Sequence, residues 1–176
     1  MGRMEGAVNQ NRNNNREIWE KYKPVIMQDK KEPFQITAAG CTLFRETGQS
    51  SSFPKKKIRI NKETTDCAIE YAIWYDYDIQ HLYELEHVWV YVNHDGSVQK
   101  AEASFHGKYL NVEDLLQEMT EAYIKEQFGF RPSMEFVPFQ LEDDMLMTWE
   151  ELEETIPVRV NCQIERIREF FANQCL

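Results

Sequence analysis

The sequence predicts an α+β fold in which an antiparallel β-sandwich core is followed by C-terminal helices packed against it. Three observations lead to this prediction. Val88, Val90 and Val92 alternate with aromatic neighbours, as the two faces of a β-strand do. The segment 93–96 reads Asn-His-Asp-Gly, a hairpin turn signal between two strand-like runs. After Asn111 the apolar residues recur at helical spacing.

The elements divide the chain into a tail and one domain. Residues 1–15 are polar and rich in Asn, so we expect a disordered tail. Residues 16–176 are expected to form a single domain, with 16–110 as a β-rich core and 111–176 as a mainly helical part. The expected strands are Val25–Met27, Phe34–Ile36, Cys41–Arg45, Ile58–Ile60, Cys67–Tyr75, Glu86–Val92 and Ser97–Phe105, after a short helix over Arg16–Tyr22.

Three further helices are expected in the C-terminal part. The first begins at the N-cap Asn111 and ends near Gly129, and an extended, proline-containing stretch follows it. Thr148 and Glu151 match a capping box for a short acidic helix, which Pro157 is expected to break. The last helix presents one apolar face made of Val160, Ile164, Ile167 and Phe171.

Composition excludes several classes of function. The chain has 176 residues and a formal net charge of −10, which argues against binding to nucleic acid and against docking on an anionic membrane. No stretch has the roughly 20 apolar residues of a membrane span, and the N-terminus lacks the apolar region of a secretory signal. We therefore expect a cytoplasmic protein. The cysteines form no C-x-x-C pair and are expected to be free, buried and inert: Cys41, Cys67, Cys162 and Cys175.

Ionisable residues gather where the central strand begins. The four histidines of the chain, His81, His87, His94 and His106, fall within 26 residues. Five acids share this region: Asp76, Asp78, Glu84, Glu86 and Glu102. Imidazole and carboxylate together bind divalent cations, and the same groups serve as general acids and bases. The alternative is a solvated rim, to which His94 in the turn is assigned. His87 fits an exposed sheet face as well as it fits a ligand.

Strand alternation sorts this cluster. Glu84 and Glu86 share a side with the three valines, the expected inward face, whereas His87 lies with Trp89 and Tyr91. The hairpin brings residues 84–86 near residues 104–106. Two inward-facing carboxylates need positive charge nearby, and a cation held by His81, Glu84, Glu86 and His106 would supply it.

Several short blocks of the chain resemble a known family. His-Leu-Tyr-Glu-Leu-Glu-His-Val-Trp-Val, residues 81–90, is similar to the GHRHDWE heptapeptide and following valine-rich strand of the necrosis-inducing protein family, the NEP1-like cytolysins. The preceding YAIWYDYD and the later EASFHGKY also resemble family segments. YKPVIMQDKKEPF and SSSFP are similar to the N-terminal part of the related vacuolar-protein-sorting-like family. The resemblance covers residues 22–109.

This resemblance implies a β-sandwich that holds calcium or magnesium at one end of the sheet. Its implied ligands are His81, Glu84, Glu86, His106 and an upstream acid, Asp78 or Asp76. Zn²⁺ and Mn²⁺ are the other ions considered. Glu84 stands where the family has Asp, and the longer side chain suits the flexible shell of calcium better than octahedral magnesium. Because Gln80, Tyr83 and Leu85 also depart from the heptapeptide, the toxin activity is not carried over.

Three functions follow from the cluster. The first is a binding module whose cation coordinates a polar small molecule, such as a glycan or a phosphate-bearing headgroup, with Trp74, Tyr75, Tyr77 and Tyr83 as stacking faces. The second is a metal-assisted hydrolase in which Glu84 or Glu86 takes a proton from water and His106 stabilises charge or protonates the leaving group. The third is a structural or interaction protein in which a metal-free His/Glu network replaces the ion.

Overall fold

The computed structural model describes residues 13–30, 35–76, 83–105, 108–111 and 135–174. Residues 13–22 are helical, so the helix expected over Arg16–Tyr22 is confirmed and includes three residues assigned to the tail. The other elements, in chain order, are β1 (Val25–Asp29), β2 (Ala38–Phe44), β3 (Gly48–Gln49), β4 (Lys57–Ile58), β5 (Thr65–Tyr75), β6 (Glu84–Asn93), β7 (Val98–Phe105), β8 (Lys108–Asn111), β9 (Phe136–Gln140), the 3₁₀ turn η1 (Asp143–Met145), β10 (Leu146–Thr148) and α4 (Trp149–Gln174).

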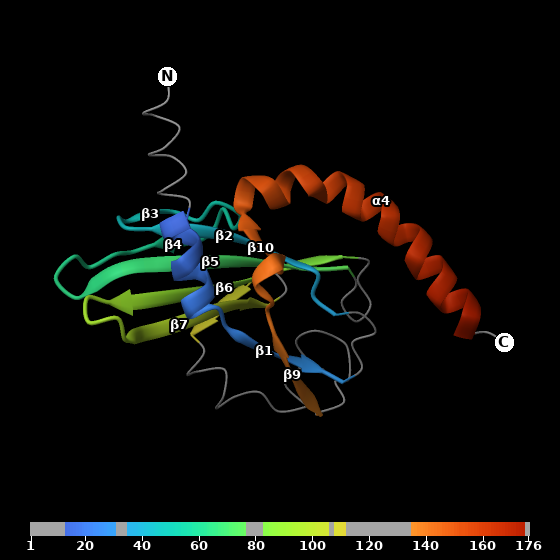
Figure 1. Ribbon diagram of the computed structural model, residues 1–176, viewed down its shortest axis with the longest axis horizontal. Helices are drawn as coiled ribbons and strands as arrows, with labels where there is room; N and C mark the ends of the chain where they lie inside the picture. Colours follow the sequence, from blue (N-terminus) through green and yellow to red (C-terminus); the bar gives the residue numbers. More distant parts are fainter. Residues whose placement is uncertain (1–12, 31–34, 77–82, 106–107, 112–134, 175–176) are drawn as a thin grey trace, which may run out of the picture.

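The described strands build one large sheet and two small ones. The large sheet has the order β10–β2–β5–β6–β7–β8, and β1–β9 and β3–β4 form separate two-stranded sheets (Figure 1). All neighbours pair antiparallel except β10 and β2, which are parallel. The predicted α+β class with a mostly antiparallel, sandwich-like core is confirmed.

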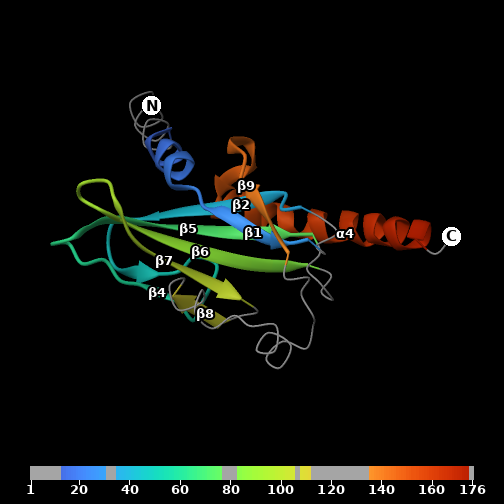
Figure 2. The same ribbon diagram turned by 90° about the horizontal axis from the view of Figure 1, so that it is seen from below.

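Strand β5 lies at the centre because both of its faces are buried. One face, with Ile69, Tyr71 and Ile73, packs under the N-terminal helix and the β1–β9 ribbon. Trp19 of the helix is 5% exposed, and its carbonyl accepts a hydrogen bond of 2.8 Å from the Tyr71 hydroxyl. Figure 2 shows the helix and the ribbon on one side of the sheet and β4 on the other.

The opposite face of the sheet carries two smaller apolar clusters. In the first, Phe53 and Ile58 from the β3–β4 segment pack on Ala68, Trp89 and Tyr91. In the second, the start of α4 packs on the sheet through contacts among Ala38, Trp74, Leu85, Trp149, Leu152, Ile156 and Val160. The two clusters leave the part of this face around His87 between them, where the polar group described below lies.

The hairpin predicted at residues 93–96 joins β6 to β7. The Gly96 N–H donates to the Asn93 carbonyl at 2.9 Å, and the Asn93 N–H donates to the Ser97 carbonyl at 2.9 Å. Gly96 has φ of 81°, a conformation that glycine adopts without steric cost. The turn signal in the sequence is therefore confirmed.

The predicted break at Pro157 is wrong. The capping box is present, since the Thr148 N–H donates to Glu151 at 2.9 Å and the Glu151 N–H donates to the Thr148 hydroxyl at 3.2 Å. The helix then continues through Pro157 as one element to Gln174, on a curved path that leaves the sheet (Figure 1). Ile156 and Val160, on either side of the proline, pack against the same cluster. That packing offsets the roughly 3 kcal/mol that a proline costs inside a helix.

The part expected to be mainly helical also contains strands. β9 falls in the stretch expected to be extended and pairs with β1, whereas β10 carries no strong alternation and was missed. The helix expected after Asn111 lies outside the described residues, as does part of the expected strand Phe34–Ile36. In the described part of the chain, no helix is long and apolar enough to cross a membrane.

The described cysteines are free thiols. Cys41 and Cys67 are buried in the core, and burial raises the pKa of both thiols, so they stay protonated. Their predicted burial is confirmed, whereas Cys162 is exposed on α4. Cys175 lies outside the described residues.

Gly40 allows α4 to pack closely on β2. A Cβ atom at Gly40 would lie 3.0 Å from Leu152 Cδ2 and 3.2 Å from the backbone Cα of Trp149. We expect Gly40→Ala to cost about 1–3 kcal/mol of unfolding free energy, because the helix must move away from the strand. Gly48→Ala is the matched control, since its nearest neighbour would be Phe44 at 3.4 Å, an ordinary contact. Urea denaturation of both variants checks this, and equal stability would contradict it.

Candidate functional site

A buried group of polar side chains surrounds His87 on β6. His87 is 2% exposed. Its Nε2 atom lies 2.9 Å from Ser52 Oγ, and its Nδ1 atom lies 3.3 Å from Ser104 Oγ. Both ring nitrogens therefore face a hydroxyl of the protein itself. The exposed sheet face, one of the two positions expected for His87, is excluded by its burial.

Glu70, in the middle of β5, is fully buried in the same group. Ser52 donates to one carboxylate oxygen from its hydroxyl at 2.8 Å and from its backbone N–H at 3.3 Å. Trp89 Nε1 donates to the other oxygen at 2.7 Å. An unpaired buried carboxylate costs on the order of several kcal/mol, and these three donors compensate for that desolvation.

Sheet register explains why these residues meet. In the β5–β6 ladder Glu70 is paired with Trp89, and Ala72 is paired with His87. Paired residues project to the same side of a sheet, so all four side chains share one face. Ala72 has only a methyl group, which leaves room beside the imidazole.

Ser104 joins the group where the next ladder stops. The β6–β7 pairing ends at Val88 and Ala103. One residue further, the Ser104 hydroxyl accepts the backbone N–H of His87 at 2.7 Å, in place of a carbonyl. The same hydroxyl donates to the Glu86 carboxylate. We call Ser52, Glu70, Glu86, His87, Trp89 and Ser104 the Glu70–His87 network.

The loop between β3 and β4 closes over this network. The Phe53 ring meets His87 edge-on, with ring centroids 5.1 Å apart, and Trp89 in the same way at 5.6 Å. Lys56 is 4% exposed, donates to Glu102 at 2.6 Å and lies 4.9 Å from the Trp89 ring centroid. The loop is thus held to the sheet by hydrogen bonds, ring contacts and a buried ion pair.

Electrostatics keep His87 neutral at physiological pH. Burial lowers the pKa of His87 to about 4, and the neighbouring Glu70 carboxylate opposes this only in part. Because the Ser52 hydroxyl donates to Glu70, the neutral imidazole donates to Ser52 from Nε2. The hydrogen bonds therefore all point in one direction: His87 donates to Ser52, and Ser52 donates to Glu70.

Glu102 is the second charged group on this side of the sheet. Burial raises its pKa, but hydrogen bonds and charge from Lys56 and Lys100 outweigh burial and hold the pKa of Glu102 below its usual value. It therefore stays ionised and paired with Lys56. The sequence placed Glu102 in the acidic cluster, and its partners in the structure are lysines.

The sequence-predicted metal and catalytic residues are described in part. Asp78, His81 and His106 lie outside the described residues, so neither the predicted catalytic set of Glu84, Glu86 and His106 nor the complete ligand set is tested. Glu84 and Glu86 are half-buried at the start of β6. The hydrogen bond between Ser104 and Glu86 shows that the two strand ends meet at these residues, as expected from the hairpin.

Asp76 is held on the α4 side of the sheet. It is 5% exposed and accepts hydrogen bonds from Trp74 Nε1 at 3.0 Å and from Thr37 Oγ1 at 3.3 Å. Trp74 and Glu86 project to opposite faces, because their register partners are Leu85 and Ile73 respectively. In the part of the chain that the structure describes, no three His, Cys, Asp or Glu side chains are grouped so that they could hold a metal ion.

Two members of the network were not singled out from the sequence. Glu70 carries a readable signal, because it is the one charged residue between Cys67 and Tyr75 in an otherwise apolar strand. Buried carboxylates of this kind are rare unless paired. Ser52 carries no such signal, since it lies in a serine-rich loop with typical turn residues.

Comparisons with protein-family models, with curated proteins and with solved structures found no match to this chain. The resemblance to the necrosis-inducing family therefore stays a prediction from short sequence blocks. Of the residues 81–90 that carry it most directly, His81 and Leu82 lie outside the described part of the chain.

The buried His87 makes stability depend on pH. In the unfolded chain its pKa is near the ordinary 6.5, whereas in the folded protein it is about 4. The folded state thus disfavours protonation, so this contribution is present above pH 6.5 and is lost as pH falls toward 4. Between pH 7.5 and pH 5 we expect a loss of about 2 kcal/mol in unfolding free energy.

Urea denaturation at a series of pH values measures this loss. The His87→Gln variant is the control, because it removes the titrating group and keeps an amide that can reach Ser52. The variant should show a flatter profile between pH 7.5 and pH 5 than the native chain. Identical slopes would assign the pH dependence to other groups.

Proposed function

We propose that the protein is a non-catalytic interaction protein in which the Glu70–His87 network is metal-free and structural. The supporting observation is the burial of Glu70, whose two carboxylate oxygens accept hydrogen bonds from Ser52 and Trp89. Protein donors thus provide the compensation that a cation would otherwise provide. Free thiols at Cys41 and Cys67 suit a reducing compartment, so the proposal places the protein in the cytoplasm.

The network's geometry favours a structural role over acid–base catalysis. A general base must come within reach of a substrate proton. His87 is 2% exposed, its Nε2 donates to Ser52, and its Nδ1 faces Ser104 beneath the edge-on Phe53 ring, so a substrate has no access to the imidazole. The network connects the β3–β4 loop to β5 and β6, and its function is to fix that loop.

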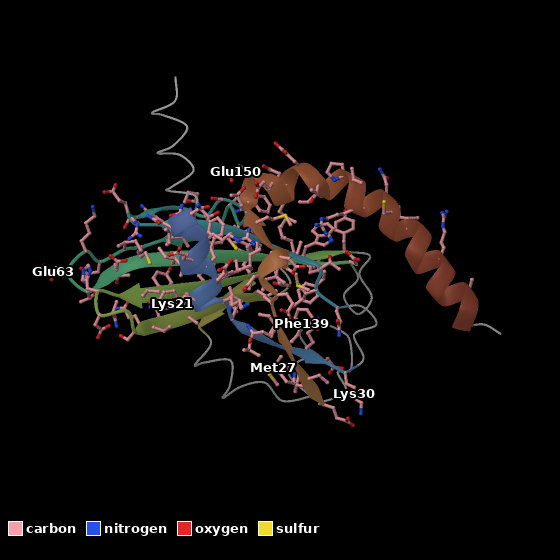
Figure 3. All side chains as sticks on the ribbon, in the orientation of Figure 1. Lys21, Met27, Lys30, Glu63, Phe139 and Glu150 are labelled. Carbon is pink, nitrogen blue, oxygen red and sulfur yellow. The ribbon has the colours of Figure 1, made fainter. Side chains whose placement is uncertain are left out.

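The β1–β9 ribbon supplies the contact surface in this proposal. Val25, Met27 and Phe136 are 54%, 56% and 43% exposed and lie on one face of the ribbon, an unusual run of exposed apolar side chains. Met27 is paired with Pro138, so they lie on one face, while Ile26 and Phe139 face the core. Figure 3 shows Met27 on the ribbon, away from the main sheet. Because the chain carries a net charge of −10, the proposed partner is a protein with an apolar patch ringed by basic residues.

The cation-binding module is the second candidate. Glu84 and Glu86 lie on the same face at the start of β6, both half-buried, as expected for carboxylate ligands of Ca²⁺ or Mg²⁺. A glycan or headgroup would then bind through the ion. The exposed Tyr83 ring stacks on Trp74 at 5.7 Å on the opposite face of the sheet, so it would not serve as the platform for that ligand. The metal-assisted hydrolase shares this site and additionally requires His106 beside Glu86.

Ion dependence of thermal unfolding separates these functions. For the metal-free network we expect the same melting temperature with EDTA and with millimolar Ca²⁺, Mg²⁺, Mn²⁺ or Zn²⁺. A native-state ion site would instead add about 2.7 kcal/mol at 100 times its dissociation constant. If one ion raises the melting temperature of the native chain but not that of Glu86→Gln, the result would favour the cation module. Turnover of phosphoesters or glycosides by the ion-loaded protein would favour the hydrolase.

Substitutions in the ribbon test whether its outer face is free surface. Met27→Glu should change unfolding free energy by less than about 0.5 kcal/mol, because the side chain is exposed. The neighbouring Ile26→Glu is the matched control and should cost about 2–4 kcal/mol, since its side chain packs against the core. Urea denaturation gives both values. A large loss in Met27→Glu would show that the face belongs to the core, and the proposed contact surface would be abandoned.

A further inference from the structure

A cavity of about 380 Å³ lies beside α4. Its other wall is formed by the end of β5 and by the segment that precedes β2. Two carboxylates, those of Asp76 and Glu154, and the guanidinium of Arg159 line it. The hydroxyls of Thr37 and Thr155 are also part of its wall. This volume falls in the range of roughly 300–1,000 Å³ that small-molecule sites occupy.

Hydrogen bonds hold Asp76 and Arg159 in place before any ligand binds. Thr37 Oγ1 donates to Asp76 at 3.3 Å and accepts from Arg159 Nη1 at 3.3 Å. Arg159 Nε donates to Thr155 Oγ1 at 2.8 Å, one turn earlier on α4. Trp74 Nε1 fixes the other end by donating to Asp76. Pre-positioned groups of this kind lose little entropy on binding.

The helical wall of the cavity is anchored to the sheet. Leu152 is fully buried, and Ile156 and Val160 pack with it against Trp74. These residues alternate along α4 with the cavity residues Glu154, Thr155 and Arg159, so the same turns that pack on the sheet also present the charges. Arg159 and Asp76 therefore come from elements with a fixed relative position.

The charges define the class of ligand. The cavity has fixed charges of both signs, with two carboxylates and one guanidinium. A purely anionic ligand would face Asp76 and Glu154, and a diamine would leave Arg159 without an anionic partner. A molecule with one carboxylate and two cationic groups matches all three charges.

We propose that this cavity binds a basic α-amino acid, whose carboxylate pairs with Arg159 and whose two cationic groups pair with Asp76 and Glu154. The site is separate from the Glu70–His87 network, and the inference does not depend on the function proposed above. Free L-lysine and L-arginine both have this chemistry. A carboxyl-amidated lysine lacks the carboxylate, and a peptide ending in lysine lacks the α-ammonium, so the two compounds test those groups separately.

Cys162 provides a direct measurement, because its exposed thiol lines the cavity. In a Cys175→Ser background, the rate of alkylation by iodoacetamide is measured with added L-lysine, L-glutamate or putrescine at constant ionic strength. Cys41 and Cys67 are buried and react slowly. We expect 10 mM L-lysine to slow alkylation about fivefold with saturation, as mass action predicts. L-glutamate and putrescine should slow it less than about twofold.

Variants of the full chain assign the effect to the cavity. Arg159→Gln should abolish protection by L-lysine, whereas Arg168→Gln, an exposed arginine on the same helix, should retain it. Glu154 is exposed, so Glu154→Gln should stay folded and still bind at least about threefold more weakly. Lysine amide and a peptide ending in lysine should each protect less than L-lysine, because each lacks one of the three charged groups. Absence of protection by L-lysine, equal protection by all three small molecules, equal protection by L-lysine and lysine amide, or protection unchanged in Glu154→Gln would each overturn the inference.

Discussion

The packing of the main sheet depends on a carboxylate in its most deeply buried part. Glu70 lies in the middle of the central strand, with no exposed surface, and its charge is compensated by Trp89 from β6 and Ser52 from the β3–β4 loop. The loop therefore does more than connect two short strands. By donating to Glu70 and accepting from His87, Ser52 fixes the position in which Phe53 covers the rings below. Removing one partner of such a network leaves an unpaired buried charge.

This arrangement explains why the strand ends at β6 and β7 can be irregular. Where the ladder stops at Val88 and Ala103, the backbone N–H of His87 would lack an acceptor. The Ser104 hydroxyl takes that role and also donates to Glu86. One side chain thus satisfies a backbone donor and a carboxylate, so the sheet can open at this end without leaving those two polar groups unpaired.

Much of the fold was readable from the sequence, and the reasons are local. The alternation in β6, the Asn-His-Asp-Gly turn and the Thr148–Glu151 capping box each depend on neighbouring residues, and each is confirmed. The path through Pro157 and the parallel strand β10 depend on distant packing, which a local pattern does not contain. The site shows the same division. The meeting of Glu86 with Ser104 followed from the hairpin, but the role of Ser52 depends on a loop returning from far along the chain.

Strand alternation also divides the acidic cluster that the sequence presents as one group. Trp74 and Leu85 are paired on one face, and Ile73 and Glu86 on the other. Asp76 bonds to Trp74 and lies beside α4, whereas Glu86 bonds to Ser104 at the β7 side. Acids that are close in sequence at a strand end thus separate in space: Asp76 is compensated beside α4, and Glu86 is compensated at the β7 edge. On the α4 side, Thr37 links Asp76 to Arg159, a cation from a helix far along the chain. Because of this link, the Asp76 carboxylate lines a cavity instead of being covered by other side chains.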